Sequence, residues 1–175
     1  VIRRMLDLAR DLPQVNLALS LHAPTQALRK RFVPSSSGAP LGKLMAAIDA
    51  YMAATGRKVL VEYCLLAGEN DTPQCAAELA ELMDGRNVTL NLIPYNPTYN
   101  PRLEQPHAAP APEAVATFQD LLFKGGVRTT VRKEKGQDIS GACGQLVVEG
   151  AGGKGGKGAS KGKAGASGRS GGAGL

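Results

Sequence analysis

Residues 58–83 decide the fold class of this chain, and they read KVLVEYCLLAGENDTPQCAAELAELM. The run over residues 58–66 is apolar and contains β-branched and aromatic residues, which is typical of a buried strand. A turn is predicted over residues 68–71, after which Thr72 is a suitable cap for a helix over residues 73–83. A strand, a turn and a helix in this order form the repeating unit of a parallel α/β sheet.

The same unit recurs along the chain. Apolar runs predict parallel strands at about residues 15–21, 58–66, 87–93 and 127–132. Amphipathic spacing predicts long helices over residues 41–55, 73–83 and 113–124. Shorter features are a helix end over 6–12, a helix capped by Thr25 that runs through Arg31, and loops over 34–38 and 94–112. Four parallel strands fit a small open sheet or the second half of a (β/α) barrel, where chemistry lies at the carboxyl ends of the strands.

The composition divides the chain into two parts. The 175 residues are 43% hydrophobic, which is enough for one domain, predicted over residues 1–148. Residues 149–175 are rich in Gly, Lys and Ser and are predicted to be a disordered tail, with a basic arm that contacts phosphates as the alternative. Five of the 21 basic residues and none of the 15 acidic ones lie in residues 150–175. The net charge of +6 therefore belongs mainly to the tail and does not indicate RNA binding by the folded part.

The sequence also carries signals about compartment and partners. No apolar run is long enough to span a membrane, and no signal peptide is visible. Cys64, Cys75 and Cys143 have no metal-ligand spacing, and their odd number argues against a disulfide framework. We expect a cytoplasmic monomer without a membrane partner, or a plastid or mitochondrial protein if a transit peptide precedes Val1. An upstream N-terminus is expected because Val1 already begins a predicted helix.

Cys143 follows the last predicted strand on a loop of small residues. Ala142 and Gly144 leave its sulfur sterically open, so the thiol is placed to react or to carry a group. The alternative is that Cys143 is a small buried hydrophobic residue.

Ser20 and His22 close the first predicted strand, with Leu21 between them. Alternation places Ser20 and His22 on one face and Leu21 on the other. A Ser/His pair is also found in hydrolases, but the sequence has no G-x-S-x-G turn and no evident orienting acid. The alternative is that the following turn satisfies these polar groups.

Asn96 lies beyond the end of the third predicted strand, where its amide can donate to and accept from an adenine or ribose edge. Ordinary Asn-Pro turn chemistry is the alternative. Two further predictions concern the basic run 29–31, which is a solvated helix face or an RNA contact, and Cys64, which is structural. Glu62 is expected to be a polar residue of the barrel interior.

Four stretches resemble one family in the same order. The run VRKEKGQDISGACGQL (131–146) resembles the C-terminal signature of the radical-SAM adenine-C2 RNA methyltransferases, the RlmN/Cfr family. The others are SLHAP (20–24), VEYCLLAGEND (61–71) and NLIPYNP (91–97). The resemblance implies the later half of a radical-SAM partial (β/α) barrel.

The resemblance also implies a reaction. S-adenosylmethionine is bound by Ser20, Leu21, His22 and Asn96, and Cys143 carries the methyl group as S-methylcysteine. The acceptor is C2 of an adenine in 23S-type rRNA, with tRNA as a further substrate. A [4Fe-4S] cluster and an electron donor for it complete the set.

Three parts of that family are missing from these residues: the C-x-x-x-C-x-x-C cluster motif, the Gly-Glu motif and a second cysteine in family context. The chain is therefore expected to be the C-terminal half of such an enzyme and inactive alone. A non-catalytic RNA-binding remnant is the alternative, and an unrelated α/β metabolic domain is a third reading.

Overall fold

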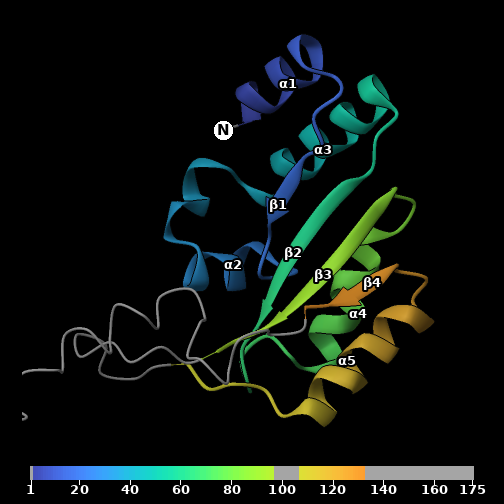
Figure 1. Ribbon diagram of the computed structural model, residues 1–175. Helices are drawn as coiled ribbons and strands as arrows, with labels where there is room; N and C mark the ends of the chain where they lie inside the picture. Colours follow the sequence, from blue (N-terminus) through green and yellow to red (C-terminus); the bar gives the residue numbers. More distant parts are fainter. Residues whose placement is uncertain (1, 97–106, 133–175) are drawn as a thin grey trace, which may run out of the picture.

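Four parallel strands form one sheet in the order β1-β2-β3-β4 in the computed structural model, which describes residues 2–96 and 107–132 (Figure 1). The strands are β1 (Ala18–Ser20), β2 (Val59–Leu65), β3 (Val88–Pro94) and β4 (Thr129–Val131). Each pair of neighbours in the sheet is consecutive in the chain, and a helix lies in every connection between them. The predicted α/β class and parallel sheet are confirmed.

The helices follow the local signals in the sequence. They are α1 (Ile2–Asp11), α2 (Gln26–Phe32), the short 3-10 helix η1 (Pro34–Gly38), α3 (Leu41–Thr55), α4 (Pro73–Met83) and α5 (Pro112–Lys124). Thr25 and Thr72 cap α2 and α4 as predicted, because their hydroxyls accept from the backbone N–H groups of Leu28 and Cys75. Gly56 ends α3 in the left-handed conformation, with φ at 66°.

The core lies between one face of the sheet and the helices. Alternate residues of β2 (Val59, Val61, Tyr63 and Leu65) are fully buried against apolar side chains of α3, α4 and α5. Tyr63 stacks on Phe118 of α5, with ring centroids 5.7 Å apart. In Figure 1, α4 lies behind β3 and β4, α5 lies beside α4 and β4, and α1 packs on α3 beyond β1.

The opposite face of the sheet, called here the open face, is not covered by any helix of the part that the structure describes. Its side chains are half-buried or exposed and come from the alternate strand positions Ala18, Ser20, Leu60, Glu62, Cys64, Thr89, Asn91, Ile93 and Thr130. A half-barrel presents its interior in the same way, with helices outside and strand side chains inside.

Three predictions about local structure need correction. The first strand is shorter than residues 15–21, because the Val15 carbonyl accepts from the Tyr51 hydroxyl of α3 instead of from a neighbouring strand. The last strand covers residues 129–131 only. The loop predicted over residues 34–38 is the 3-10 helix η1.

Cys143 and the predicted tail over residues 149–175 lie outside the described residues. Among residues 2–96 and 107–132, no helix is both long and apolar enough to cross a membrane.

Candidate functional site

The candidate site lies where the carboxyl ends of β1, β2 and β3 meet. Ser20 is the last residue of β1, His22 follows two positions later, and Asn96 lies two residues beyond the end of β3. All three residues therefore lie at or beyond the carboxyl ends of strands, as expected for a parallel sheet, while the register places Ser20 level with Asn91, five residues before Asn96.

Ser20 and His22 are brought together around Glu62 of β2. The Ser20 hydroxyl donates to Oε2 of Glu62 at 3.4 Å, and the same carboxylate acts electrostatically on the His22 imidazole. His22 lies outside β1 with φ at 62°, so strand alternation does not set the direction of its side chain. Its imidazole nevertheless lies near Glu62, the residue that also accepts from Ser20.

Leu21 contributes differently from its two neighbours. Its side chain is fully buried in the core, its N–H donates to the Glu62 carbonyl at 2.9 Å, and its carbonyl accepts from Arg29. Both backbone polar groups of Leu21 thus have partners within the chain, and Leu21 acts by placing Ser20 and His22.

A row of polar side chains crosses the open face at the level of Ser20. Ser20, Glu62, Asn91 and Thr130 are paired in register across all four strands. Thr130 donates to Oδ1 of Asn91 at 3.2 Å, so the row consists of two hydrogen-bonded pairs. Hydroxyl, carboxylate and amide groups in one row can bind the hydroxyls, amino group and ring nitrogens of a polar ligand.

Sequence reasoning left Glu62 without a role and missed Asn91 and Thr130 in this row. The sequence contains a signal, because Glu62 and Asn91 each stand between two buried apolar residues of a mainly apolar strand. What the sequence does not give is the register that places them opposite one another.

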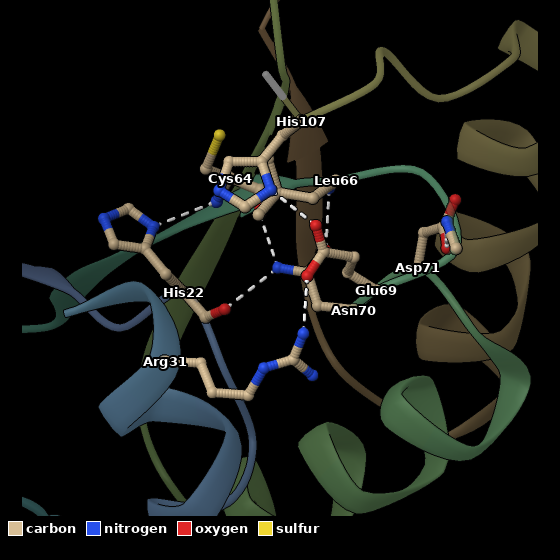
Figure 2. Close-up of polar contacts among 9 residues, drawn as sticks. His22, Arg31, Cys64, Leu66, Glu69, Asn70, Asp71 and His107 are labelled. Atoms are coloured by element: carbon tan, nitrogen blue, oxygen red, sulfur yellow. Dashed lines mark hydrogen bonds and ion pairs between the residues drawn. The ribbon is translucent and has the colours of Figure 1, made fainter. Parts of the chain in front are cut away.

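His22 is held as a neutral imidazole. The backbone N–H of Cys64 donates to its Nδ1 at 3.0 Å, as Figure 2 shows. Burial lowers the pKa of His22 from its ordinary value of 6.5, nearby Arg29 lowers it further, and the carboxylate of Glu62 opposes both. At neutral pH the site therefore presents a histidine without charge.

A second cluster borders the site. The carboxylate of Glu69 accepts from Arg31 of α2 at 2.9 Å and contacts Nδ1 of His107 (Figure 2). The His107 ring lies edge-on to the rings of Phe32 and Tyr95. The cluster ties α2, the turn after β2 and the segment before α5 to one another.

The basic run 29–31 is not one solvated face, which corrects the prediction made for it. Arg29 is only 5% exposed and donates to the carbonyls of Leu21 and Ala39, while Arg31 pairs with Glu69. Lys30 alone remains a simple exposed cation of this run in the described structure.

The described residues do not provide an iron–sulfur site. Among residues 2–96 and 107–132, no three His, Cys, Asp or Glu side chains are grouped so that they could hold a metal ion. Cys64 lies on the open face, whereas Cys75 is buried in the core on the helix side of the sheet, so these two thiols cannot bind one cluster. Burial also raises the pKa of Cys64, which keeps its thiol protonated.

The polar edge does fit S-adenosylmethionine in its chemistry. A hydroxyl, a neutral imidazole, a carboxylate and amides are the groups that bind ribose hydroxyls, an α-amino group and an adenine edge.

Comparisons with known proteins agree with this fold. No protein-family model matches the chain. The chain is 48% identical over 139 residues to a probable dual-specificity RNA methyltransferase RlmN of Desulforudis audaxviator, covering 79% of this chain and 42% of that protein. It is 41% identical over 149 residues to a second such protein, RlmN 2 of Protochlamydia amoebophila, covering 85% of this chain and 40% of the relative.

Solved structures give the same result. A radical SAM methyltransferase from Sphaerobacter thermophilus superposes with a TM-score of 0.75 at 43% identity, over 83% of this chain and 41% of that one. A domain of a pyruvate-formate lyase-activating enzyme from Bacteroides vulgatus shares the fold alone, with a TM-score of 0.56 at 16% identity over 75% of this chain and 74% of that one. Spanning about two fifths of the length of the curated relatives it matches, the chain belongs to the family of the RlmN radical SAM RNA methyltransferases.

Proposed function

We propose that this chain forms the part of a radical SAM RNA methyltransferase that binds S-adenosylmethionine through Ser20, His22 and Asn96 and carries the methyl group on Cys143. The acceptor is C2 of an adenine in 23S-type rRNA, and tRNA is the second substrate. The observation that supports this most is that Ser20, Glu62 and His22 lie together at the carboxyl edge of the sheet. The RlmN proteins to which the chain is similar agree with this proposal.

The residues of this chain would bind and orient the cofactor. The Ser20 hydroxyl and the imidazole of His22 offer hydrogen bonds to ribose or carboxylate oxygens, and Asn96 offers an amide to the adenine edge. Glu62 accepts from Ser20 and thereby fixes the direction of its hydroxyl. A [4Fe-4S] cluster, which the described residues do not hold, would supply the electron that cleaves S-adenosylmethionine into methionine and a 5′-deoxyadenosyl radical.

Radical chemistry suits the proposed acceptor. The hydrogen on C2 of adenine is not acidic and the carbon is electron-poor, so a polar methyl transfer to it would fail. A cysteine that first receives the methyl group separates loading of the carrier from transfer to RNA, which is the usual benefit of covalent catalysis. In the sequence, Cys143 stands between the small residues Ala142 and Gly144.

Mass spectrometry of the protein purified from its source tests this proposal. Trypsin releases residues 136–154 as one peptide that contains Cys143. We expect this peptide to carry one additional methyl group on the cysteine. An unmodified Cys143 in every preparation, together with no C2-methyladenine formed in RNA, would reject the enzyme and favour a non-catalytic RNA-binding protein.

The 175-residue chain by itself is expected to be inactive. Its described residues contain no group that could hold the cluster, and the sequence has no C-x-x-x-C-x-x-C motif. Cluster-dependent cleavage of S-adenosylmethionine by the isolated chain would contradict this expectation.

A further inference from the structure

The backbone of His22 has a conformation that its own sequence does not favour. Among residues 2–96 and 107–132, His22 is the one residue other than glycine with a positive φ. L side chains rarely adopt this conformation, and it persists where surrounding contacts hold it. The neighbours of His22 must therefore supply those contacts.

Two buried side chains hold the carbonyl groups on either side of this point. Arg29 of α2 donates through Nε to the Leu21 carbonyl at 3.2 Å, and Asn70 donates through Nδ2 to the His22 carbonyl at 2.9 Å. Arg29 is 5% exposed and Asn70 is fully buried. A buried donor that lost its acceptor would pay a desolvation penalty, so each bond resists a change in the His22 backbone.

Asn70 uses its whole amide for this purpose. Its Nδ2 also donates to the Cys64 carbonyl at 2.7 Å, and its Oδ1 accepts from the N–H of Leu66 at 2.7 Å (Figure 2). The backbone carbonyl of Asn70 accepts from the Tyr63 hydroxyl at 2.9 Å, which anchors the turn in the core. Both donor hydrogens of Asn70 are occupied within the protein, so Asn70 positions other groups and does not bind a ligand.

The hydrogen bonds of Asn70 also determine which nitrogen of His22 carries the proton. Asn70 joins the His22 carbonyl to the Cys64 carbonyl, and the Cys64 N–H donates to Nδ1 of the imidazole at 3.0 Å. An Nδ1 that accepts cannot carry a hydrogen, so the neutral ring has its proton on Nε2. The charged groups that act on the ring are Glu62 of β2 and Arg29 of α2.

We propose that Asn70 and Arg29 are positioning residues that hold His22 in its left-handed conformation and fix its imidazole as a neutral Nε2–H donor. The ligand that accepts this hydrogen bond is S-adenosylmethionine, and this clause rests on the function proposed above. A neutral donor offers one hydrogen bond to a ribose or carboxylate oxygen and no positive charge. His22 thus recognises an acceptor atom, and an ion pair is not involved.

Nitrogen NMR of the imidazoles tests the positioning role without any ligand. The chain has two histidines, so labelling histidine with ¹⁵N and substituting His107→Gln assigns the His22 signals. We expect the wild-type ring to show one fixed tautomer with an unprotonated Nδ1. Asn70→Ala should give an average of two tautomers and a titration midpoint shifted up towards the ordinary value. The control is Asn16→Ala, which removes a surface partner of Arg57 and should leave both observations unchanged.

Two further variants guard against loss of folding. If Asn70→Ala has no cooperative thermal transition, Asn70→Ser and Arg29→Lys are measured in its place. Each of these removes some of the hydrogen bonds made by the native side chain and keeps more of its packing. A folded variant of either residue whose His22 spectrum equals the wild-type spectrum would overturn the positioning role.

Binding of S-adenosylmethionine separates this inference from the proposed function. In the natively expressed protein, calorimetry should show roughly fivefold to tenfold weaker binding for Asn70→Ala than for wild type. A lost tautomer with unchanged affinity would overturn the cofactor contact at His22 and still support the positioning by Asn70. An unchanged tautomer with weaker binding would overturn the positioning and leave the proposed function standing.

Discussion

His22 is the residue through which pH should act on this fold. Burial lowers its pKa below 6.5, so the unfolded chain takes up the proton at a higher pH than the folded chain does. The free energy of unfolding is therefore expected to be full above that value and to decrease as pH falls through 6.5 towards the folded pKa. Protonation of Nδ1 also breaks the hydrogen bond from Cys64, which gives the shift its structural consequence.

Urea denaturation at about pH 7.5 and about pH 5.5 measures this effect. His22→Gln should reduce the pH dependence, because it removes the group that titrates. His107→Gln is the control, since His107 pairs with Glu69 at the neighbouring cluster and takes no part in the hydrogen bonds of Asn70 and Arg29 around His22. An equal decrease in wild type and His22→Gln would show that another group is responsible.

At the scale of helices, the N-terminal cap of α4 is a measurable contribution to stability. The Thr72 hydroxyl accepts from the N–H of Cys75 at 3.2 Å, and an alanine side chain has no acceptor to replace it. We expect Thr72→Ala to lower the free energy of unfolding by about 1 kcal/mol. Thr117→Ala on the exposed face of α5 is the matched control, and its effect should stay within about 0.5 kcal/mol. Equal effects of the two substitutions would mean that the cap contributes nothing.

The contact between α4 and α5 depends on the absence of a side chain at Gly125. A Cβ atom at this position would lie 2.6 Å from the Cβ of Ala80, so the helices would have to move apart. Gly125→Ala should lower the free energy of unfolding by about 1–3 kcal/mol. Gly42→Ala in α3 is the control with the same chemical change, because its Cβ would meet nothing within 4 Å and alanine favours the helix by up to about 1 kcal/mol. A Gly125→Ala variant as stable as wild type would show that the two helices adapt without cost.

The helices were also the part that sequence predicted best, for a physical reason. Caps and stops such as Thr72 and Gly56 act on residues within one turn, so their signals are local. The role of Asn70 was not predicted, because its partners His22 and Cys64 come from two strand ends that only the sheet brings together. Arg29 was misread for the same reason: a basic residue in a short helix is usually solvated, and only the tertiary fold shows that it is buried.

At the scale of the whole molecule, the two faces of the sheet have different roles. One face holds the core against α3, α4 and α5, whereas the open face carries the polar row from Ser20 to Thr130. Under the function proposed above, the open face admits a cofactor and a nucleotide and is not packed with apolar side chains, so the stability of the chain comes from the helix side. The relatives are more than twice as long as the part that matches this chain.

Leu90→Ala and Leu60→Ala compare the two faces with one chemical change. Leu90 of β3 is fully buried against the helices, whereas Leu60 of β2 points to the open face and is 37% exposed. Loss of the Leu90 side chain leaves a cavity in the core and should lower the free energy of unfolding by about 2–5 kcal/mol. Leu60→Ala removes a side chain that is already partly in water and should cost less than about 1 kcal/mol. Urea denaturation of both variants measures the difference. If Leu60→Ala lowers the free energy of unfolding as much as Leu90→Ala does, the open face is packed in solution, against another copy or another part of the chain. In that case the polar row would not be accessible to a ligand, and the assignment of this face to S-adenosylmethionine would fail with it.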